Sequence, residues 1–573
     1  MTDASSQSPP ASPGNSPRRA RREGQHQSLN RSPKSMQERI MAHPRILALV
    51  LGLIAATGYP PLGLWPLTLL GIAGLIALLR RAEARKQAAL IGYLFGWAHL
   101  TLANNWIATA FTFQGKMPSL LGWLAVPLLC LYLAVYPALA ALITHEIAQR
   151  LGGRLGARKS ASALAYVILF ASLWIVTEWL RSWVFTGYPW PPLGLALLGG
   201  WEAPGIAKLL PWMGTYALSG IAVLIAGAAL WTLEKRQWLL GAALAVAVTV
   251  QMFVPGNFGA QAGQAGQEGT VRFTLVQPNI PQEERDAAHK FEEHFARLAK
   301  HSYDEDNPKR IIFWPESAVP DYLRDGYPQR YYSQRTIAAD PGFARQRIGT
   351  TIGSNGKLMF GAVDLEIGEK MGRETAVGAY NAVTTIDGEG NLGARYSKSH
   401  LVPYGEYLAL RWLLEPLGAT RLVAGSIDFI PGPGPQTFDL GDYGKAGVQI
   451  CYEIVFSGQV VDRSNRPDYI FNPSNDGWFG SWGPPQHLGQ SRMRALEEGL
   501  PVLRSTTDGI SAVVDASGIV RQHIPSGADG GISGFIPPAK APTWFAQIGN
   551  ALPLIWAALL FVISIVVLRR RAR

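Results

Sequence analysis

The chain has 573 residues, 48% of them hydrophobic, a formal net charge of +11 and only two cysteines, which excludes a small domain held together by disulfides. Its mean hydropathy of +0.08 averages two unlike parts, because residues 45–255 contain long apolar runs whereas residues 268–540 have the composition of a soluble domain. Residues 268–540 hold 27 Lys and Arg against 33 Asp and Glu, a net charge of −6, so the remainder carries +17, which argues for a membrane topology signal and against nucleic-acid binding.

The amino-terminal stretch, residues 1–43, is rich in Ser, Pro, Gln and Arg and has almost no large apolar side chains. Such a composition cannot bury a core, so we expect a disordered, basic cytoplasmic tail. It does not read as a signal peptide, because the apolar stretch begins too late and no small-residue cleavage site precedes a mature domain.

Eight apolar segments of roughly membrane-spanning length follow: 44–58, 64–80, 88–110, 118–146, 160–180, 212–232, 237–254 and 548–568. Basic clusters precede the first segment and follow the second, fourth, sixth and eighth. Because basic residues gather on the cytoplasmic side, every even crossing returns to the cytoplasm. We therefore predict about eight transmembrane helices, seven within residues 44–255 and the last at 548–568. A basic cytoplasmic tail at 569–573 follows, and the domain before the last helix faces away from the cytoplasm.

The end of the fifth segment carries charged and aromatic residues together. Glu178 and Arg181 lie three residues apart, and Tyr188 and Trp190 follow at the expected outer membrane interface. These four side chains are candidates for binding a phospholipid head group. The alternative is an interfacial aromatic belt with a local ion pair.

A stretch rich in Gly, Gln and Ala, residues 256–269, predicts a linker to a soluble domain at 270–540. In that domain short β-rich runs alternate with helical stretches and Pro/Gly-rich loops. The candidate strands are 271–277, 310–314, 357–363, 382–386, 446–450, 469–472 and 510–514.

Cys451 is the only cysteine of the soluble domain, and the other, Cys130, lies in the fourth apolar segment. A disulfide between them is therefore excluded. A lone thiol at the end of a short apolar strand indicates a nucleophile, although a small buried hydrophobic residue is the alternative.

Two further reactive groups also follow strands. Glu316 comes after an apolar run that ends in Phe-Trp-Pro, where a carboxylate is partly desolvated and can serve as a base. Lys398 lies at a third transition from strand to loop. Glu, Lys and Cys in this order resemble the catalytic constellation of the nitrilase superfamily. In that chemistry the carboxylate takes the thiol proton, the thiolate attacks an acyl carbon, and the ammonium stabilises the oxyanion.

The eight apolar segments and several motifs together resemble the apolipoprotein N-acyltransferase family over about residues 45–570. The motifs are VQPNIPQ at 276–282, WPESA at 314–318, HLVPYGE at 400–406, CYE at 451–453 and SNDGWFG at 474–480. The resemblance implies a nitrilase-type α-β-β-α sandwich inserted before the last transmembrane helix.

The resemblance also implies an activity, the last step of bacterial lipoprotein maturation. An acyl chain moves from a phospholipid, typically phosphatidylethanolamine, to the α-amino group of the diacylglyceryl-cysteine of an apolipoprotein. The reaction passes through a thioester on Cys451 in a ping-pong order and uses no cofactor. We expect a monomer in the bacterial cytoplasmic membrane, with both termini cytoplasmic and the catalytic domain facing the periplasm.

Glu316, Lys398 and Cys451 match the family's catalytic residues, and Glu406, Tyr452 and Glu453 match supporting residues. On residue chemistry alone Glu406 is a solvated loop carboxylate, whereas the resemblance gives it a role in holding Lys398 or assisting proton transfer. Glu453 is either an acid bound to backbone amides or a direct participant. A backbone amide, that of Tyr452, is a candidate oxyanion donor.

One later helix contains further polar residues. His487 has no second ligand at a suitable spacing, so we predict no metal site and a structural histidine. Arg492, Arg494 and Glu497 are expected to form buried ion pairs under the site.

The sequence departs from the family pattern at two positions. Asp286 replaces a tryptophan that several members place after the Ile-Pro-Gln motif, and Thr507 replaces an asparagine. Residues 401–430 are unusually apolar for a connection, and we expect a lid there that contacts the membrane or acyl chains.

Two rival functions use the same residues differently. A membrane-tethered nitrilase-like amidase would resolve the acyl-enzyme with water, but such an enzyme has no need of eight spans. An inactive lipid-binding scaffold or transporter is disfavoured because Glu316, Lys398 and Cys451 are all present.

Overall fold

The structure, a computed structural model, describes residues 43–113, 120–152, 160–255, 269–414, 416 and 427–569. The predicted basic tail up to residue 42, nearly all of the predicted linker (256–268), part of the predicted lid (415 and 417–426) and the tail after residue 569 lie outside the described residues. The chain divides into two units, residues 1–47 and 48–573, and the second unit holds nearly all of the helices and every strand.

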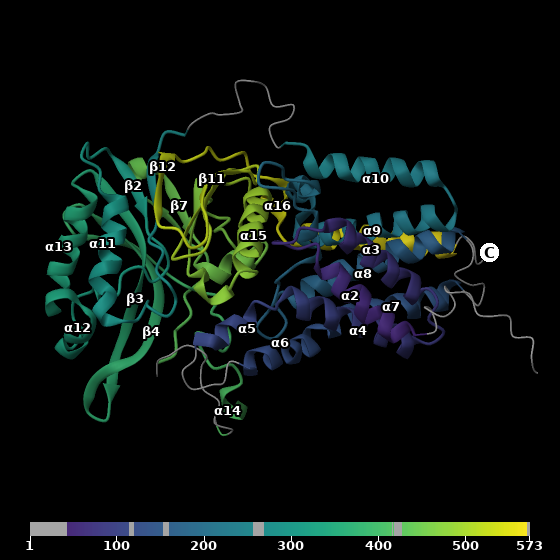
Figure 1. Cartoon of the computed structure of the whole chain (residues 1–573), viewed down its shortest axis with the longest axis horizontal. Coiled ribbons are helices and arrows are strands. Elements are labelled where there is room, and N and C mark those ends of the chain that lie inside the picture. The colour runs from purple at the N-terminus through teal and green to yellow at the C-terminus, as the bar shows by residue number, and fades with distance from the viewer. Residues whose placement is uncertain are drawn as a thin grey trace, which may run out of the picture. The chain divides into compact units, whose positions relative to one another are not determined.

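Apolar helices make up the region up to residue 253 and the carboxyl-terminal end (Figure 1). They are α2 (Pro44–Ala56), α3 (Trp65–Leu79), α4 (Arg85–Ala103), α6 (Leu120–Leu133), α7 (Val135–Gly152), α8 (Ser160–Arg181), α9 (Leu210–Glu234), α10 (Trp238–Phe253) and α17 (Ala551–Arg569). Among the described residues, four stretches are long and apolar enough to cross a membrane: Leu120–Leu151, Ala163–Arg181, Ile206–Glu234 and Ala551–Arg569. Three other apolar helices, α2, α3 and α10, are shorter. The count of eight crossings remains a prediction.

Two predicted spans are not single helices, and one of them, 118–146, contains α6 and α7, which are separated at Ala134. Within residues 88–110, α4 ends at Ala103 and a separate short helix, α5 (Ile107–Ala110), follows. The Asn104 side chain donates to the carbonyl oxygen of Leu100 at 2.9 Å and accepts from the Tyr188 hydroxyl at 2.7 Å. This polar residue therefore closes the end of α4 and connects it to the segment after α8.

Small residues allow the helices to approach closely. A Cβ atom added at Gly92 in α4 would lie 2.7 Å from the Cβ of Ala141 in α7, so only glycine permits this crossing. The Ser172 hydroxyl in α8 donates to the carbonyl oxygen of Ala557 in α17 at 2.9 Å. The carboxyl-terminal helix is thereby joined to the helices that precede the soluble domain.

The soluble domain contains two six-stranded sheets. The first has the order β12-β1-β2-β3-β4-β5, and its central strands β1, β2 and β3 are parallel, while the other pairings are antiparallel. Its strands are β1 (Arg272–Gln277), β2 (Arg310–Phe313), β3 (Gly356–Lys370), β4 (Arg373–Asp387), β5 (Leu392–Ser397) and β12 (Gly530–Phe535). β3 and β4 form a long hairpin of 15-residue strands that extends beyond the sheet (Figure 1).

The second sheet has the order β11-β10-β9-β8-β7-β6, with β7, β8 and β9 parallel. Its strands are β6 (Thr437–Asp439), β7 (Lys445–Val448), β8 (Tyr469–Ser474), β9 (Val502–Thr506), β10 (Ser511–Val514) and β11 (Val520–Ile524). Both sheets thus have three parallel strands at their centres, whose carboxyl ends lie at one edge of each sheet.

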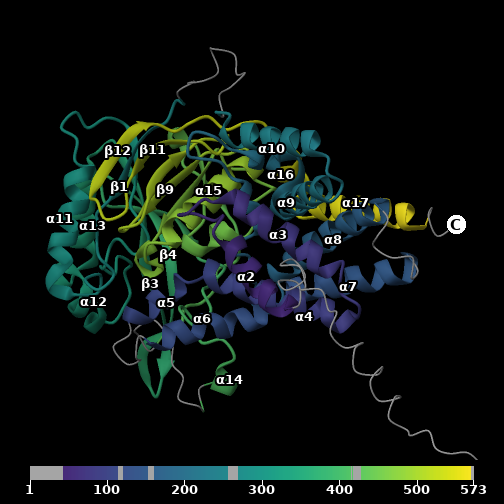
Figure 2. The same cartoon turned by 45° about the vertical axis from the view of Figure 1, so that its right-hand side comes forward.

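The alternation of side chains along β2 explains how the layers form. Phe313 faces the second sheet and packs on Phe471 of β8, with ring centroids 4.8 Å apart. Its neighbour Ile312 faces the opposite way, into a cluster with Leu298 of α11 (Phe291–Ser302) and Ile348 of α13 (Pro341–Ile352). The views in Figures 1 and 2 place α11 and α13 outside the first sheet, and α15 (Gly483–Glu498) packs against β9 and β10 of the second.

The seven strands expected from the sequence are all present, with longer hairpin strands than predicted. The predicted ranges do not include β5, β6, β9, β11 or β12, although the strand end expected before Lys398 is the end of β5. β12 contains three glycines, β11 carries a polar Arg-Gln-His centre at the sheet edge, and β9 has a buried arginine in its middle. These strands form because they pair with neighbouring strands, more than because of the β-propensity of their own residues.

Candidate active site

Cys451 begins a helical turn directly after the central strand β7. β7 ends at Val448, and the turn η8 spans Cys451–Val455. The thiol residue is 4% exposed and has a φ of 51°, a left-handed conformation that strains any residue other than glycine. Such strain, kept where a nucleophile is expected, is typical of functional positions.

Lys398 follows β5 and lies between two carboxylates. Its Nζ is 3.0 Å from the nearest oxygens of Glu406 and 3.6 Å from Oε1 of Glu316. All three side chains are buried. The loop carboxylate is therefore the closer partner of the ammonium, and Glu316 is the more distant one.

Two asparagines hold the carboxylates in place. The Asn381 side-chain amide, from β4, donates to Glu316 at 2.7 Å and to Glu406 at 2.9 Å. The backbone N–H of Asn475 donates to the other oxygen of Glu316 at 2.7 Å. Glu316 is thus oriented by donors from both sheets, with one oxygen directed to the lysine.

The charges of the site set the protonation of the thiol and the ammonium. Burial raises the pKa of the Cys451 thiol, Glu316 raises it further, and Lys398 opposes the shift. Burial lowers the pKa of Lys398, but the carboxylates of Glu406 and Glu316 outweigh this effect and raise it above its ordinary value. The resting thiol is therefore protonated beside a charged ammonium, so a base is needed to form the thiolate.

Glu453 connects the lysine loop to the cysteine loop. Its Oε1 accepts hydrogen bonds from the Tyr396 hydroxyl at 2.7 Å, from the Ser399 amide at 2.7 Å and from the His400 amide at 3.2 Å. Its Oε2 accepts from the Ile450 amide at 2.8 Å. This set of donors favours the structural alternative for Glu453, because the carboxylate fixes the residues next to Lys398 and Cys451.

Tyr452 lies among aromatic rings beneath the site. Its ring is 5.1 Å from that of Phe456 and 6.4 Å from that of Tyr188, measured between centroids. Its buried hydroxyl has no hydrogen-bond partner within the described part of the chain. Tyr452 therefore joins η8 to the segment after α8 through its contact with the Tyr188 ring.

A buried polar network not expected from the sequence lies behind Cys451. His487 of α15 lies 3.1 Å from the carbonyl oxygen of Cys451 through Nε2 and 3.1 Å from Asp476 through Nδ1. Arg504 of β9 donates to both oxygens of Asp476, at 2.8 and 2.6 Å. The predicted structural role of His487 therefore includes a direct contact with the candidate nucleophile's backbone.

Glu178 and Arg181 at the end of α8 bind the chain itself. The guanidinium of Arg181 donates to the carbonyl oxygens of Trp190 and Pro191, and Glu178 accepts from the Leu193 amide at 2.8 Å. The ion pair between the two side chains measures 3.6 Å. Both charged side chains bind backbone groups of residues 190–193. Their contact with a lipid head group stays a prediction.

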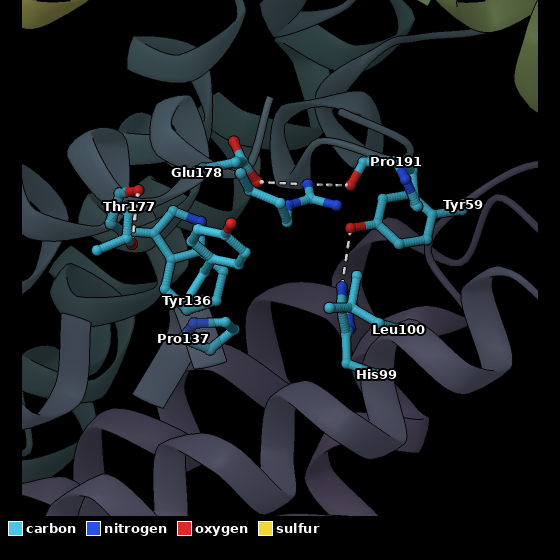
Figure 3. A pocket seen from close by; sticks show the side chains of 10 residues that line it. Tyr59, His99, Leu100, Tyr136, Pro137, Thr177, Glu178 and Pro191 are labelled. Carbon is cyan, nitrogen blue, oxygen red and sulfur yellow. Dashed lines mark hydrogen bonds and ion pairs between the residues drawn. The ribbon is translucent and has the colours of Figure 1, made fainter. Parts of the chain in front are cut away.

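A small cavity borders this pair. Figure 3 shows Tyr59, hydrogen-bonded to His99 at 2.9 Å, on the same side as Pro191, and Thr177 and Tyr136 on the other side. The cavity measures about 20 Å³, room for about one water molecule. It is lined by Tyr59, His99, Leu100, Tyr136, Pro137, Trp174, Thr177, Glu178, Arg181 and Pro191.

Tyr188 and Trp190 connect the membrane helices to the soluble domain. Tyr188 donates to Asn104 and faces Tyr452, whereas Trp190 is fully buried and donates to Oε1 of Gln486 in α15 at 2.8 Å. Of the four residues predicted to bind a head group, Tyr188 therefore lies next to Tyr452, a supporting residue of the site.

One prediction about α15 is wrong. Arg494 does form a buried ion pair with Glu497, at 2.7 Å. Arg492 instead donates to the backbone carbonyl oxygens of Gly199, Gly200, Ala203 and Gly518 at 2.6–3.0 Å. Four carbonyl oxygens supplied by loops compensate its charge, which spacing along a helix cannot reveal.

The two departures from the family pattern have local partners. Asp286 forms ion pairs with Arg285 at 2.8 Å and with Arg335 at 2.7 Å and is half-exposed. The Thr507 hydroxyl lies 2.8 Å from the side-chain amide of Asn475. Thr507 therefore still hydrogen-bonds the residue that orients Glu316.

The sequence motifs identified Glu316, Lys398, Glu406 and Cys451 as site candidates. They did not indicate Asn381 or the hydrogen-bond network formed by Asp476, His487 and Arg504. Asn381 has no sequence signal, because it enters the site only through the pairing of β4 with β5. Among the described residues, no three His, Cys, Asp or Glu side chains are grouped to hold a metal ion.

Two family models match the chain: the "Apolipoprotein N-acyltransferase N-terminal domain" over residues 51–228 and "Carbon-nitrogen hydrolase" over residues 272–542. Bacterial proteins named apolipoprotein N-acyltransferase are similar over most of the length. The one from Rhodopseudomonas palustris is 30% identical over 553 residues, covering 92% of this chain and 95% of its own. Those from Bradyrhizobium diazoefficiens and Vibrio cholerae are 31% and 29% identical, covering 92% and 90% of this chain and 95% of each relative.

Proposed function

Because the chain belongs to the apolipoprotein N-acyltransferase family, we propose that it acylates the amino terminus of diacylglyceryl lipoproteins with an acyl chain taken from a phospholipid. The chain is an acyltransferase with a carbon–nitrogen hydrolase domain. The observation that carries the proposal is the buried cluster in which Lys398 lies 3.0 Å from Glu406 and 3.6 Å from Glu316, because the charges of Lys398 and Glu316 act on the thiol of the strained Cys451.

The first half-reaction forms a thioester. Glu316 takes the proton of the Cys451 thiol, and the thiolate attacks the ester carbonyl carbon of the donor. The negative charge that develops on the carbonyl oxygen is stabilised by Lys398. When the tetrahedral intermediate collapses, the ester C–O bond breaks, Glu316 returns the proton to the leaving alkoxide, and a lysophospholipid departs.

The second half-reaction forms an amide. The α-amino group of the acceptor attacks the thioester carbonyl, and Glu316 takes a proton from the attacking nitrogen. Collapse breaks the C–S bond, and the thiolate of Cys451 recovers the proton from Glu316. The product is a triacylated lipoprotein, and the order is ping-pong because one product leaves before the second substrate reacts.

Glu406 has a supporting role in this scheme. Its carboxylate balances the charge of Lys398 at 3.0 Å and accepts the Val402 amide at 2.8 Å, which fixes the loop that follows the lysine. The ammonium thereby remains charged, as oxyanion stabilisation requires.

The membrane helices suit substrates that reside in a bilayer. Extracting an acyl chain into water costs about 0.8 kcal/mol per CH₂ group, so an enzyme that works at the membrane surface avoids this cost. We propose phosphatidylethanolamine as the donor and a monomer with eight spans in the cytoplasmic membrane. The catalytic domain faces the periplasm and both termini face the cytoplasm, as the distribution of basic residues predicts.

The proposal is tested with purified protein in mixed micelles of detergent and phosphatidylethanolamine. A diacylated lipopeptide with a free amino terminus should gain the mass of one acyl chain, and the Cys451→Ala variant should yield no product. Cys130→Ala, which alters a buried thiol of α6, is the matched control and should behave as wild type. Release of free fatty acid without triacylated product would contradict the proposal and favour a hydrolase.

A further inference from the structure

His487 is held behind the candidate nucleophile in a fully buried aromatic environment. Its ring lies 5.0 Å from that of Trp190 and 5.5 Å from that of Phe479, measured between centroids. Nε2 is 3.1 Å from the carbonyl oxygen of Cys451, and Nδ1 is 3.0 Å from Nη2 of Arg504. Both ring nitrogens are therefore occupied by groups of the protein.

The partners determine where the proton of the imidazole lies. A carbonyl oxygen only accepts hydrogen bonds, so Nε2 must carry a hydrogen and donate to Cys451. A guanidinium only donates, so Nδ1 accepts from Arg504 in the neutral ring, whereas a protonated Nδ1 would donate to Oδ1 of Asp476, which lies 3.1 Å away. Burial and the charge of Arg504 lower the pKa of His487, which agrees with the neutral form. Protonation of Nδ1 would leave the Nε2 bond unchanged.

The rest of the network keeps the imidazole in this state. Arg504 binds both oxygens of Asp476, and its charge keeps the pKa of that buried carboxyl below the ordinary value. Arg504 also donates to Oδ1 of Asn472 at 2.5 Å, so its guanidinium is fixed between β8 and β9. The orientation of His487 is thus set by residues of the sheet core.

The hydrogen bond from His487 acts on one particular peptide group. The carbonyl oxygen of Cys451 and the amide hydrogen of Tyr452 are the two ends of the same planar unit. Within the described residues the Tyr452 amide has no protein acceptor, although it is buried. Donation to the carbonyl fixes the plane of this peptide and polarises it, which makes the amide a stronger donor.

We propose that His487 is a positioning residue that orients and polarises the Cys451–Tyr452 peptide, so that the Tyr452 amide acts with Lys398 as the second oxyanion donor. This inference rests on the proposed function, since it concerns the oxyanion of the same acyl transfer. His487 does not act as the base for the thiol, because Nε2 donates to a carbonyl oxygen and Nδ1 is bound to Arg504.

Two reactions of the Cys451 thiol distinguish a role of His487 in oxyanion stabilisation from a general effect of His487 on the reactivity of this thiol. Thioester formation from a phospholipid develops an oxyanion, whereas alkylation of Cys451 by iodoacetamide displaces iodide at a saturated carbon and develops none. In His487→Phe the aromatic volume remains but the donor is lost. We expect the single-turnover rate of thioester formation to fall about 10²-fold, near the loss typical for one oxyanion donor. Alkylation of Cys451 should stay within about threefold of wild type, and the KM for phospholipid should be unchanged.

Gln490→Met, an apolar replacement one turn further along α15, is the matched control and should keep both rates. Equal rates of thioester formation in wild type and His487→Phe would overturn the inference, and so would a parallel loss of acylation and alkylation. If His487→Phe does not fold, the acylation rates of His487→Gln and His487→Asn are compared instead. Glutamine can reach the carbonyl of Cys451 and asparagine cannot, so Gln should acylate at least tenfold faster, and equal rates would refute the inference.

Failure of the proposed function gives a different result. If wild type forms no thioester at all, the acyl-transfer scheme itself is wrong. If wild type forms the thioester and the His487 variants match it, only the role of the histidine is wrong.

Discussion

The ammonium of Lys398 lies between two carboxylates that are placed differently. Glu406 is nearer and holds the ammonium, whereas Glu316 is positioned by the Asn381 side chain and the Asn475 amide. Burial raises the pKa of the Cys451 thiol, and in the proposed scheme Glu316 accepts the proton of this thiol. In the proposed scheme, therefore, Glu406 balances the charge of Lys398 and Glu316 transfers the proton.

Replacing the base or the cation should stop turnover without unfolding the protein. Glu316→Gln keeps the shape of the side chain but removes the proton acceptor, and Lys398→Met keeps its length but removes the charge. We expect each rate of triacylated lipopeptide formation to fall by about 10²–10³-fold or more. Lys300→Met, at an exposed lysine of α11, is the control. Near-normal activity of either variant would refute its assigned role.

The candidate reactive residues could be located from the sequence because each one follows a strand and lies in or near a motif that resembles the family pattern. Glu316, Lys398 and Cys451 come within three residues of the ends of β2, β5 and β7. The residues that orient them could not be predicted. Asn381 reaches two carboxylates only because of the register of β4, and His487 reaches Cys451 only because α15 packs beneath η8. Such contacts depend on tertiary packing, which no local pattern contains.

At the scale of elements, α15 is the most unusual part of the fold. All but one of its 16 residues are buried, although the helix carries two arginines and two glutamates. Arg494 and Glu497 form an ion pair, and Glu497 also accepts from the Thr215 amide of α9 at 2.7 Å. The helix therefore supplies polar contacts to both the sheet and the membrane helices.

The last residue of this helix, Glu498, should make stability depend on pH. Burial and the nearby Glu497 raise its pKa from 4.5 to about 7. The folded protein thus binds the proton more tightly than the unfolded chain, so stability falls as pH rises from about 4.5 to about 7 and is then constant. The difference is on the order of 3 kcal/mol. Glu498→Gln should raise the Tm in detergent at pH 8 and leave it almost unchanged at pH 5.

The control for Glu498→Gln is Glu305→Gln, at an exposed position before β2, which should change neither Tm. An equal shift of Tm at both pH values for Glu498→Gln would show that the carboxylate is not protonated in the folded protein.

The elements themselves differ in how far their own residues determine them. Every apolar segment predicted from the sequence contains a helix, because the apolar runs are long, but the breaks at Asn104 and Ala134 were not foreseen. Central strands such as β2 are buried on both faces and read as continuous apolar runs. Edge strands such as β11 and β12 contain polar residues and glycines and form because a neighbour pairs with them.

At the scale of the whole molecule, specific polar contacts join the membrane helices to the catalytic domain. Trp190 donates to Gln486, Arg492 donates to Gly199 and Gly200, and Glu497 accepts from Thr215. These bonds come from segments more than 250 residues apart in the chain. The site is therefore held in a fixed relation to the helices at which its lipid substrates would arrive.

The topology can be tested independently of the chemistry. Basic clusters follow every even apolar segment, so a reporter that is active only outside the cytoplasm should be active when fused after Gln264. The same reporter fused after Arg573 should be inactive. The reverse pattern would overturn the eight-span arrangement.

The central claim is that Cys451 carries the acyl group between a phospholipid and an amine, and intact-mass measurement tests it most directly. Enzyme given phospholipid alone should gain one acyl chain at Cys451 that neutral hydroxylamine removes. A diacylated lipopeptide with a free amino terminus should discharge it to a triacylated product, whereas the acetylated lipopeptide should not. An adduct that persists in Cys451→Ala, or one that water discharges as fast as the lipopeptide, would contradict the account.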